Sequence, residues 1–483
     1  MKKELVKIPQ QLSEFSRIGP VYLVGGSLRD RILHRPSNDH DFAVPGDAGA
    51  FAQKVAAKLG TSPIVLGKGN QVVFRVASDD DSLDFSPLQG RTIEDDLKRR
   101  DFTVNALGLD LGGGRLIDPV GGLNDIRSKT IRVISEEAIK ADPLRMVRAF
   151  RLGAVLGFDI APDTLSVIKK LSPHITRTAG ERIRSELMRM MDAGGSFPYL
   201  KQMFDAGLLI QLFPELEPCA HCPSDQQGQS VLHHVLRTYQ EMESLIEELE
   251  VLWPSYVEPI RAYLTEGHRN VLLKWAAMLH DIGKPQTHSV DDSGKVRFLA
   301  HEEKGALLAK NVYTRLRMSA AEQTYLELII GNHLHPLHLF SAHQEDRLTA
   351  KGLIRFVRKY QDHVVGLLLH SVADQRAKTG HDIEVEKGLL AFFEEILRRY
   401  FEHFKPAMAA ARLVTGRDLI EQFGLSPSVQ IGRLLQTVEE ARLSGEVQTR
   451  EEAIKLVARL LELEGDAGIE PATPSSGGLC SIR

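Results

Sequence analysis

The sequence predicts an α+β protein, in which a small mixed α/β head is followed by an all-α neck, a second helical domain and a helical tail. Three observations support this class. Short apolar runs bounded by turn residues alternate with helical spacing over the first 125 residues. Beyond about residue 126, apolar residues recur at i, i+3 and i+4, as in amphipathic helices. The length of 483 residues corresponds to about three domains at roughly 150 residues each.

The elements of the head follow from local patterns. VYLVGG at 21–26 predicts a short apolar strand that ends in glycines, and the following SLRDRILH has helical spacing. Three further runs are also strand candidates because they are short, apolar and bounded by turn residues: DFAV at 41–44, QVVFRV at 71–76 and SLDF at 82–85.

Helices are predicted for most of the remaining chain. The spacing marks the segments 142–157, 163–171, 180–192, 231–250, 271–282, 301–317 and 320–334. A boundary between two helical regions is indicated by Pro214, Pro218 and Pro223. We therefore expect a head at 1–125, a neck at 126–217, a second domain at 218–385 and a helical tail domain at 386–465. Residues 466–483 change abruptly to Gly, Pro, Ser and Thr, and we expect them to be disordered.

Composition excludes several classes of protein. With 60 basic and 64 acidic residues the net charge is −4, so binding to nucleic acid by bulk positive charge is excluded. The hydrophobic fraction of 43% and the charged fraction of 26% exclude disorder of the whole chain. The sequence has no apolar run of membrane-spanning length and no secretory signal at its N-terminus. Three cysteines form no disulfide framework, which favours the cytoplasm.

Two carboxylates in the head predict a metal site. Asp39 and Asp41 are one residue apart on a predicted strand, so their side chains share a face and repel each other. A divalent cation removes that repulsion, and oxygen ligands suit Mg²⁺. Gly25 and Gly26 end a strand and open a helix, where backbone N–H groups can hold phosphate, and Arg29 adds a cation one turn later. Taken singly, each of these signals also fits an ordinary turn.

The combination of motifs is more specific. Gly25-Gly26-Ser27-Leu28-Arg29-Asp30, then Asp39-His40-Asp41, then Arg99-Arg100-Asp101-Phe102-Thr103-Val104-Asn105-Ala106 closely resembles the class II tRNA nucleotidyltransferase and bacterial poly(A) polymerase family. The resemblance continues through Asp118-Pro119, Gly121-Gly122 and Asp142-Pro143-Leu144-Arg145-Met146-Val147-Arg148-Ala149, and covers roughly residues 20–190.

This resemblance implies a template-independent transfer of nucleotides to the 3′ end of tRNA. Asp39 and Asp41 would bind the Mg²⁺ ions of a two-metal in-line displacement. The phosphates of the nucleotide would be held by Gly25, Gly26, Arg29 and Arg100. Asp101 would bind the ribose hydroxyl and so select ribonucleotides over deoxyribonucleotides. Asn105 lies in the same motif and would also bind the nucleotide. Asp84, on the strand beside the two aspartates, is either an additional carboxylate of the site or an ordinary surface residue.

A base-reading motif is implied farther along. Asp142, Arg145 and Arg148 are spaced to face one groove, where carboxylate and guanidinium would distinguish cytosine from adenine. The family motif begins with Glu, whereas this chain has Ala141. The same residues also fit a helix N-cap followed by proline and a surface ion pair. Glu181 and Arg184 match a later family motif that braces this groove.

The segment between the predicted strand at 82–85 and the run at 93–97 is short. It contains only Ser86-Pro87-Leu88-Gln89-Gly90-Arg91-Thr92, whereas relatives that add all of CCA usually carry a longer flexible loop there. The resemblance therefore favours addition of CC from CTP. Addition of the full CCA end from CTP and ATP is the alternative, and a poly(A) polymerase is a further one.

Histidines in the second half resemble the HD phosphohydrolase superfamily. The corresponding residues are His234, His280, Asp281, His301, His333 and Asp374. Imidazole and carboxylate ligands of this kind suit Mn²⁺, Ni²⁺, Co²⁺ or Fe. The implied chemistry is that of a phosphatase or a 2′,3′-cyclic phosphodiesterase, and a degenerate structural HD domain is the alternative. An HD domain disfavours a poly(A) polymerase, because bacterial enzymes of that kind usually carry a basic tail instead. Cys219 and Cys222 form a single CxxC, which is weak evidence for zinc and more typical of a proline-rich loop with spare thiols.

The expected partner is the acceptor arm of tRNA, held by shape and phosphate contacts. Positive charge in the head and neck is concentrated in Lys98, Arg99, Arg100, Arg145, Arg148, Arg151, Lys169, Lys170 and Arg182. An RNA-binding or nucleotide-sensing protein with inactive sites is the rival from another class. The intact Asp39, Asp41 and Asp101 argue against it.

Overall fold

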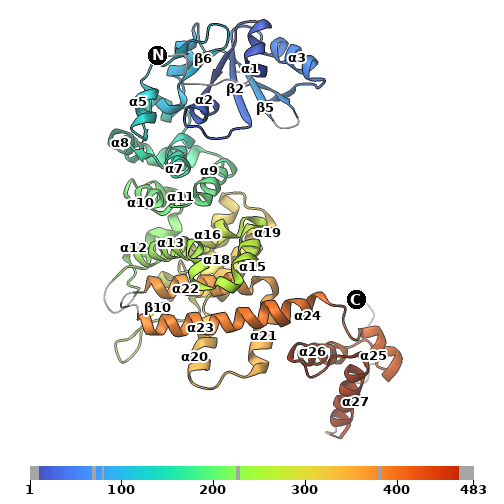
Figure 1. The fold of residues 1–483 in the computed structure, drawn as a ribbon. Coiled ribbons are helices and arrows are strands. Elements are labelled where there is room, and N and C mark those ends of the chain that lie inside the picture. Colours follow the sequence, from blue (N-terminus) through green and yellow to red (C-terminus); the bar gives the residue numbers. More distant parts are fainter. Residues whose placement is uncertain are drawn as a thin grey trace, which may run out of the picture. The chain divides into compact units, whose positions relative to one another are not determined.

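The computed structural model describes residues 10–67, 72–78, 81–224, 229–378, 380 and 382–466. The chain forms two compact units. The first comprises Met1–Glu243 and Asn270–Gly331, and the second comprises Ser244–Arg269 and Asn332–Arg483 (Figure 1). The tail predicted at 466–483 lies outside the described residues beyond Asp466. None of the described helices combines the length and apolar character needed to cross a membrane.

The head is built on one mixed seven-stranded sheet with the strand order β3-β4-β5-β2-β1-β6-β7. Its strands are β1 (Tyr22–Val24), β2 (Asp39–Val44), β3 (Ile64–Leu66), β4 (Val73–Ala77), β5 (Ser82–Pro87), β6 (Gly108–Asp110) and β7 (Leu116–Ile117). The central pair β2·β5 is parallel and every other neighbouring pair is antiparallel. The predicted α+β class and the four predicted strands are confirmed, with Gln71 outside the described residues. The strands β3, β6 and β7 are too short to give a periodic signal.

Alternation along β2 separates the core of the head from its open edge. Phe42 is fully buried and stacks on Phe85 of β5, with ring centroids 4.8 Å apart. Helix α3 (Ala48–Leu59) covers this side of the sheet and brings Phe51 onto Phe85. On the other face of β2, Ala43 packs under α4 (Ile93–Lys98), whereas Asp39 and Asp41 at the start of the strand stay exposed. The acidic pair therefore lies where the sheet is uncovered.

A helical region follows the head within the first unit (Figure 1). Before residue 225 its helices are α5 (Gly122–Arg127), α6 (Glu136–Ala141), α7 (Leu144–Leu156), α8 (Pro162–Leu171), α9 (Gly180–Asp192), α10 (Phe197–Asp205), α11 (Leu208–Leu212) and α12 (Glu217–His221). After it come α13 (Val231–Glu247), α16 (Arg269–Leu279), α17 (Lys284–Thr287), α18 (His301–Arg315) and α19 (Ala320–Asn332). The predicted helices are thus present, with ends shifted by a few residues.

Close backbone contacts hold this helical region together. A Cβ atom on Gly180, at the start of α9, would lie 1.8 Å from the carbonyl oxygen of Arg315 at the end of α18. Only glycine fits that approach. Two small strand pairs, β8 (Thr130–Ile131) with β9 (Asp159–Ile160) and β10 (His288–Val290) with β11 (Val296–Phe298), were not predicted, because two or three residues give no periodicity.

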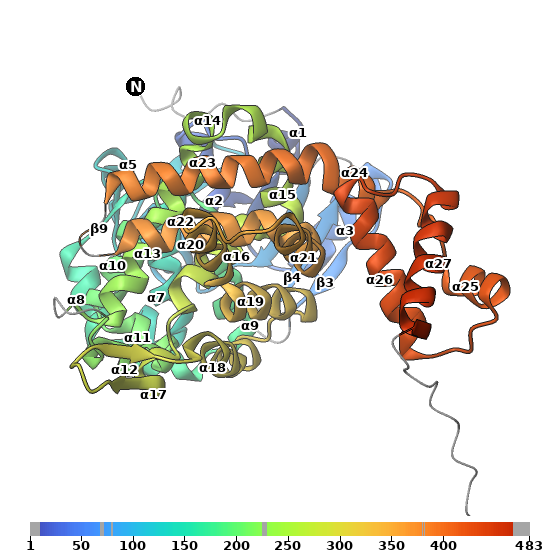
Figure 2. The ribbon, with the colours of Figure 1, turned by 90° about the horizontal axis from the view of Figure 1, so that it is seen from below.

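The second unit is helical throughout its described residues. Its helices are α14 (Leu249–Leu252), α15 (Val257–Thr265), α20 (His335–Gln344), α21 (Ala350–Tyr360), α22 (Val364–Ala377), α23 (Ile383–Arg399), α24 (Lys405–Ala409), α25 (Gly416–Phe423), α26 (Val429–Ser444) and α27 (Arg450–Asp466). The last three gather around an apolar core that includes Leu419, Leu434 and Val457 (Figure 2). This core is the centre of the predicted helical tail segment.

Candidate functional site

The acidic edge of the head carries three carboxylates on two paired strands. Asp41 on β2 is in register with Asp84 on β5, and Asp84 is in register with Arg75 on β4. Arg75 donates two hydrogen bonds to Asp84, Nε to Oδ1 at 2.8 Å and Nη2 to Oδ2 at 2.7 Å. A bidentate pair of this kind satisfies both oxygens of Asp84. The carboxylates without such a cationic partner are therefore Asp39 and Asp41, the pair that the sequence singled out.

The electrostatics of Asp41 fit a bound cation. Although its side chain reaches solvent, loss of hydration raises the pKa of Asp41. Arg100 opposes that rise, while the charges of Asp84 and Asp39 add to it. Negative charge at this edge thus exceeds what the protein itself neutralises. Oxygen ligands on two neighbouring aspartates suit Mg²⁺, so the donor set fits the ion that the resemblance implies.

A glycine at the start of α2 (Gly25–Ile32) lets a cation approach this pair. Gly25 has φ of +74°, and a Cβ there would lie 3.0 Å from Nη1 of Arg100 and 3.1 Å from Oδ2 of Asp41. Any side chain would separate the two. Arg100 is held from behind by Asp96, whose Oδ2 accepts from Nε at 3.2 Å and from Nη2 at 3.0 Å. Arg100 is therefore presented to the acidic edge, as a phosphate ligand beside the metal site would be.

Arg29 lies differently from the sequence expectation. The expected role is a phosphate contact, and the side chain is only 9% exposed. Its guanidinium donates to both oxygens of Asp30 at 2.9 Å and to Oδ1 of Asn105 at 2.5 Å. Since the amide oxygen of Asn105 accepts from Arg29, its amide nitrogen points the other way and donates to Asp101. In this structure Arg29 thus orients Asn105, and its charge also acts on Asp41 at the acidic edge.

Asp101 is a buried carboxylate surrounded by donors. Its Oδ1 accepts from the N–H of Phe102 at 2.8 Å and from Nδ2 of Asn105 at 3.0 Å, and its Oδ2 accepts from Nη1 of Arg148 at 3.2 Å. Burial favours the neutral acid, but the charge of Arg148 and the hydrogen bonds outweigh it and lower the pKa of Asp101. The group is an ionised acceptor at neutral pH.

The three residues expected to face one groove have different hydrogen-bond partners, although the charges of Arg145 and Arg148 both act on Asp101. Arg145 donates through Nη1 to the carbonyl oxygens of Arg99 at 3.4 Å, Arg100 at 3.4 Å and Ala138 at 3.1 Å. Its Nε is buried and has no hydrogen-bond partner among the described residues. A guanidinium fixed in this way offers its remaining donors to a ligand.

The other two members of that expected set have carboxylate and guanidinium partners. Asp142 accepts from Nη2 of Arg182 at 2.8 Å, and Arg148 bonds to Asp101 and to Glu186. Arg148 thus contacts Asp101 and Glu186, whereas Asp142 contacts Arg182. Arg184, which the resemblance places in support of this groove, forms an ion pair with Glu322 of α19 at 2.6 Å.

Several partners were missed by sequence reasoning. Asp96 lies one helical turn before Arg100, an i, i+4 spacing that is a readable signal for an ion pair. No local pattern identifies Arg75, Arg182 or Glu186. Several of the predicted basic residues are already paired in this way: Arg100, Arg148, Arg151, Lys170 and Arg182.

The short segment between β5 and α4 is held at both ends. Thr92 caps α4 in a capping box with Asp95, and the N–H of Arg91 donates to Oδ2 of Asp95 at 3.1 Å. The N–H of Gln89 donates to Oδ1 of Asp96 at 2.9 Å. The same Asp96 carboxylate therefore ties this segment to Arg100.

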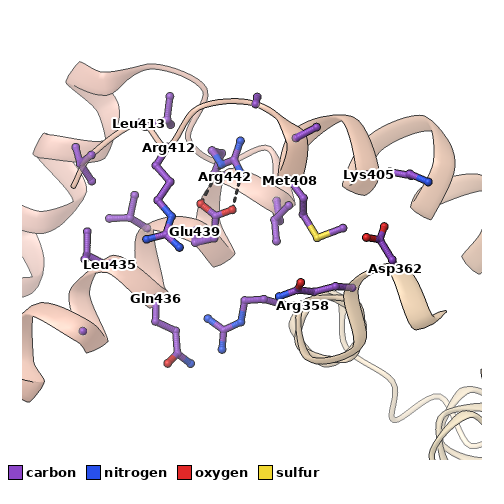
Figure 3. Close-up of a pocket in the computed structure, with 17 residues that line it drawn as sticks. Arg358, Asp362, Lys405, Met408, Arg412, Leu413, Leu435, Gln436, Glu439 and Arg442 are labelled. Atoms are coloured by element: carbon purple, nitrogen blue, oxygen red, sulfur yellow. Dashed lines mark hydrogen bonds and ion pairs between the residues drawn. The ribbon is translucent and has the colours of Figure 1, made fainter. Parts of the chain in front are cut away.

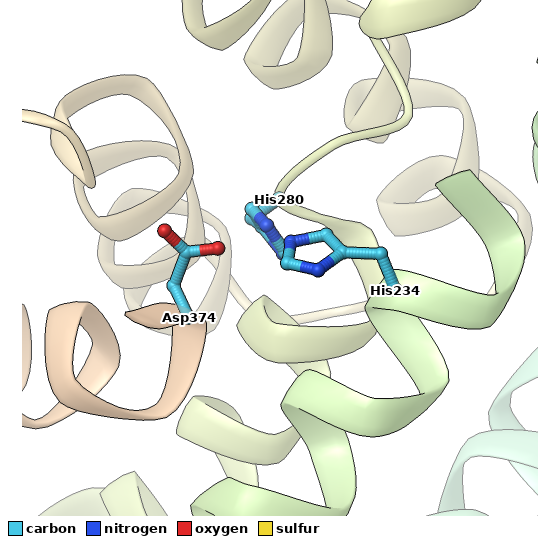
Figure 4. A group of neighbouring side chains, drawn as sticks. All are labelled: His234, His280 and Asp374. Carbon is cyan, nitrogen blue, oxygen red and sulfur yellow. The ribbon is translucent and has the colours of Figure 1, made fainter. Parts of the chain in front are cut away.

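Four of the expected HD ligands converge in the first unit. Nε2 of His234, of His280 and of His301 lie 3.4, 3.2 and 3.2 Å from the carboxylate of Asp281. Figure 4 shows the rings of His234, from α13, and His280, which follows α16. His280 and Asp281 belong to groups of side chains that could hold a metal ion. His233 is exposed, whereas His234 is only 6% exposed.

Backbone carbonyls orient two of these rings. Nδ1 of His280 lies 3.0 Å from the carbonyl oxygen of Ala277, and Nδ1 of His301 lies 2.8 Å from that of Phe298. A carbonyl partner keeps the proton on Nδ1 and leaves Nε2 with its lone pair for a metal. A Cβ on Gly283 would lie 2.1 Å from the carbonyl oxygen of His301, so glycine is needed for α18 to bring His301 so close.

The remaining expected HD ligands belong to the second unit. His333 follows α19 and is 1% exposed, and its carbonyl accepts from Oγ of Ser371 at 3.1 Å. Asp374 lies on α22 and is 4% exposed (Figure 4). Buried residues of these two types are uncommon unless they are paired or bind a ligand.

The CxxC of the sequence forms no disulfide. Cys219 and Cys222 are free and buried, and Cys219 lies on α12 instead of in the expected loop. Burial raises the pKa of Cys219 to about 12, so its thiol is protonated at neutral pH.

The second unit also contains a cavity of about 740 Å³ between α21, α24 and α26. Figure 3 shows Arg358, Lys405 and Arg412 on its walls. Arg442 is neutralised there by an ion pair with Glu439. Arg358 pairs with Glu440 and Asp362 adds a negative charge, so Lys405 and Arg412 leave the cavity with a small positive excess.

Comparisons with known proteins agree with this geometry. Residues 21–132 match the poly A polymerase head domain, 157–219 the probable RNA and SrmB-binding site of polymerase A, and 231–357 the HD domain. The chain is 32% identical to the A-adding tRNA nucleotidyltransferase of Deinococcus radiodurans, over 91% of this chain and 95% of that protein. It is 30% identical to the CC-adding tRNA nucleotidyltransferase of Geobacter sulfurreducens, over 94% of this chain and 95% of that protein. It is 32% identical to the CC-adding tRNA nucleotidyltransferase of Thermus thermophilus, over 89% of this chain and 91% of that protein.

Solved structures share the fold. The Thermotoga maritima CCA-adding enzyme complexed with tRNA has a TM-score of 0.64 at 21% identity, covering 95% of this chain and 97% of that one. A CCA-adding enzyme in an apo form has a TM-score of 0.63 at 22% identity, covering 93% of this chain and 92% of that one. With near-complete coverage at more than 30% identity to its curated relatives, this chain belongs to the tRNA nucleotidyltransferase family.

Proposed function

We propose that this chain adds the two cytidines of the CCA end to tRNA, transferring CMP from CTP to the 3′ hydroxyl with release of pyrophosphate. Two observations favour this specificity. Relatives named CC-adding align along most of the chain. The segment between β5 and α4 is short, and its Gln89 and Arg91 N–H groups donate to Asp96 and Asp95. The second observation carries the proposal, because a short segment lacks the length of the flexible loop that relatives adding all of CCA usually carry.

The acidic edge of β2 would perform the transfer. Asp39 and Asp41 would hold Mg²⁺, which supplies charge neutralisation for an in-line displacement at the α-phosphate. Arg100, presented through Gly25, would bind the triphosphate together with backbone N–H groups at the start of α2. Asp101 would accept a hydrogen bond from the ribose 2′ hydroxyl, because its lowered pKa keeps it ionised.

Base selection would lie with Arg145 and Asp142. Arg145 is anchored by backbone carbonyls through Nη1, and its buried Nε has no hydrogen-bond partner among the described residues. Cytosine offers acceptors at N3 and O2 and a donor at N4, so a guanidinium and a carboxylate match its pairing edge. Asp142 shares an exposed ion pair with Arg182, which contributes little stability and is readily exchanged for a base contact.

The alternatives differ in product. A full CCA-adding enzyme would extend with CTP and then ATP, and the Deinococcus relative named A-adding makes addition of A alone a further outcome. The test uses tRNA transcripts that end at the discriminator base or at CC, with CTP and ATP alone and together. A product that stops at CC with both nucleotides present is expected. A product ending in CCA, or extension of only the CC transcript by ATP, would reject the CC specificity.

A poly(A) polymerase is disfavoured because residues 231–357 match the HD domain. The transcript assay separates it as well, since such an enzyme would add long runs of A to unrelated RNA. A binding protein with inactive sites is disfavoured by the intact Asp39, Asp41 and Asp101.

The neck and tail would hold the tRNA acceptor arm. We propose a head at 1–125, a neck at 126–217, an HD domain at 218–385 and a helical tail domain at 386–465. The basic cavity of the second unit would contact RNA phosphates through Arg358, Lys405 and Arg412. Binding through phosphates predicts an affinity that falls steeply with salt concentration. The free thiols of Cys219 and Cys222 accord with a reducing compartment such as the cytoplasm.

The HD region would be a second, hydrolytic centre. His234, His280, Asp281 and His301 would bind a divalent metal such as Mn²⁺, Ni²⁺ or Co²⁺, with His333 and Asp374 as further ligands. A metal bound there would supply an activated water for phosphatase or 2′,3′-cyclic phosphodiesterase chemistry. The test loads the protein with each metal and offers 2′,3′-cyclic AMP and p-nitrophenyl phosphate. Metal binding without turnover of either substrate would favour the structural alternative.

A further inference from the structure

One buried carboxylate in the neck, Glu186, binds an arginine that in turn binds Asp101. Glu186 on α9 is 7% exposed, and its Oε1 accepts from Nε of Arg148 at 3.0 Å. Its Oε2 accepts from Nε of Arg151 at 2.8 Å. Both arginines lie on α7, so Glu186 joins α9 to that helix by two ion pairs.

The guanidinium of Arg148 is shared by two carboxylates. Its Nε side bonds to Glu186 while Nη1 bonds to Oδ2 of Asp101 at 3.2 Å. A planar guanidinium with donors fixed at two edges has little rotational freedom. The position of Arg148 against Asp101 is therefore set by Glu186.

Asp101 is also held from the head. Asn105 donates to its Oδ1, and Arg29 holds Asn105 in the orientation that makes this possible. The Oδ2 atom has one protein donor in the described structure, Nη1 of Arg148, and a carboxylate oxygen has room for a second. That second position is the one a ribose hydroxyl can take.

We infer that Glu186 is a positioning residue for selection of ribonucleotides over deoxyribonucleotides. This rests on the proposed function, in which Asp101 accepts the 2′ hydroxyl. When Glu186 no longer holds Arg148, the guanidinium either turns both donors onto Asp101 and fills the second position, or moves away and leaves the carboxylate without its anchor. Both outcomes weaken the hydrogen bond to the 2′ hydroxyl and leave the phosphate and base contacts in place.

The experiment compares Glu186→Gln with the wild-type protein in tRNA extension, using CTP and dCTP separately. Where ATP proves to be the substrate, ATP and dATP replace them. We expect kcat/KM for the ribonucleotide to fall by about tenfold, as for loss of one hydrogen bond to a charged group, while that for the deoxynucleotide changes less than about twofold. This fall in kcat/KM should come mainly from a rise in KM for the ribonucleotide, with kcat changing less.

Two further variants keep the result interpretable. Glu136→Gln is the matched control, because Glu136 also pairs with two cations in the neck, Lys140 and Lys170, but does not contact the site. Arg148→Lys retains the charge but cannot bridge two carboxylates, and it should reproduce the loss if Glu186→Gln fails to fold. Equal losses with both sugars in these variants would overturn the inference and leave Glu186 a purely structural residue.

The underlying role of Asp101 is tested separately. Asp101→Asn should itself reduce the preference for the ribose sugar. If it does not, the proposed reading of ribose by Asp101 fails, whatever Glu186→Gln shows. If Asp101→Asn loses the preference and Glu186→Gln retains it, only the positioning inference fails.

Discussion

Two buried carboxylates of the first unit, Asp101 in the head and Asp281 in the HD region, have different kinds of hydrogen-bonding and charged neighbours. Asp101 is 8% exposed and is surrounded by groups that carry their protons permanently: a backbone N–H, an amide and a guanidinium. Asp281 is 1% exposed and is surrounded by three imidazoles and Lys284, whose Nζ lies 2.6 Å away. Imidazole and carboxylate groups gathered in this way are a donor set that suits a divalent metal.

This difference separates two kinds of preorganisation. The surroundings of Asp101 are complete as the protein folds, so the acceptor is ready before any nucleotide arrives. The rings of His280 and His301 are oriented by backbone carbonyls with their Nε2 atoms near Asp281, and a divalent ion is proposed to bind there. We therefore expect nucleotide transfer to depend on individual carboxylates, and thermal stability to depend on metal occupancy of the HD centre.

The largest effect is expected at the acidic edge. Asp41→Ala should lower nucleotide transfer by about a thousandfold or more, because several kcal/mol of charge stabilisation are removed. Binding of tRNA in a filter or anisotropy assay should persist. Asp205→Asn, in an exposed pair with Lys201, is the control and should transfer normally. Normal transfer by Asp41→Ala would reject the enzyme proposal.

The next effect concerns the HD centre. Adding Mn²⁺, Ni²⁺ or Co²⁺ to metal-stripped protein at about 100 times the dissociation constant should raise the free energy of unfolding by about 2.7 kcal/mol. Asp281→Asn should abolish this shift, measured by thermal denaturation, whereas Asp101→Asn should retain it. A metal-dependent shift of equal size in Asp281→Asn would contradict the assignment of this ligand.

A smaller effect should distinguish Asp101 by its pH dependence. Its pKa is lowered in the folded chain, so its ionised form contributes stability that is fully present above the ordinary value of about 3.9. That contribution is lost as the pH falls through the lower value of the folded state. Asp101→Asn should therefore cost about 1–3 kcal/mol of unfolding free energy at pH 7, measured with urea. The difference from wild type should shrink below about pH 4, and a difference that grows on acidification would contradict this sign.

The smallest effect is expected at the exposed pair of Asp142 with Arg182. Arg182→Gln should change the free energy of unfolding by less than about 1 kcal/mol, since exposed ion pairs contribute little. Asp142→Asn should leave stability similarly unaffected but alter the ratio of CTP to ATP use. An unchanged ratio would remove Asp142 from base selection.

Sequence reasoning identified the parts of the site that lie close together in the chain. Asp39 and Asp41 share a face because side chains alternate along a strand, and that strand was predicted from its local pattern. The helix before His280 ends at Leu279, close to the predicted end at residue 282. The spacing of Asp142, Arg145 and Arg148 was read as one groove, and the structure gives each of them different partners.

Long-range partners were beyond the reach of local patterns. Arg148 and Asp101 are 47 residues apart, and Glu186 is 38 residues from Arg148. Their contact depends on how α7 and α9 pack against each other, which no spacing within either helix specifies. The Arg75 pair with Asp84 depends likewise on the register of β4 against β5.

What the sequence by itself determined is the set of chemical groups: two carboxylates on a strand, a nucleotide-binding string, and histidines in the order of a metal centre. It also determined the α+β class, because the periods of strands and helices are local properties. Only the tertiary structure decided which of these groups are presented to a substrate and which are held by one another. Arg29 and Arg148, both expected at the nucleotide, are bound to carboxylates and an amide of the protein. The physical reason is that a buried charge must find its partner within the folded chain, and packing brings that partner from a distant segment.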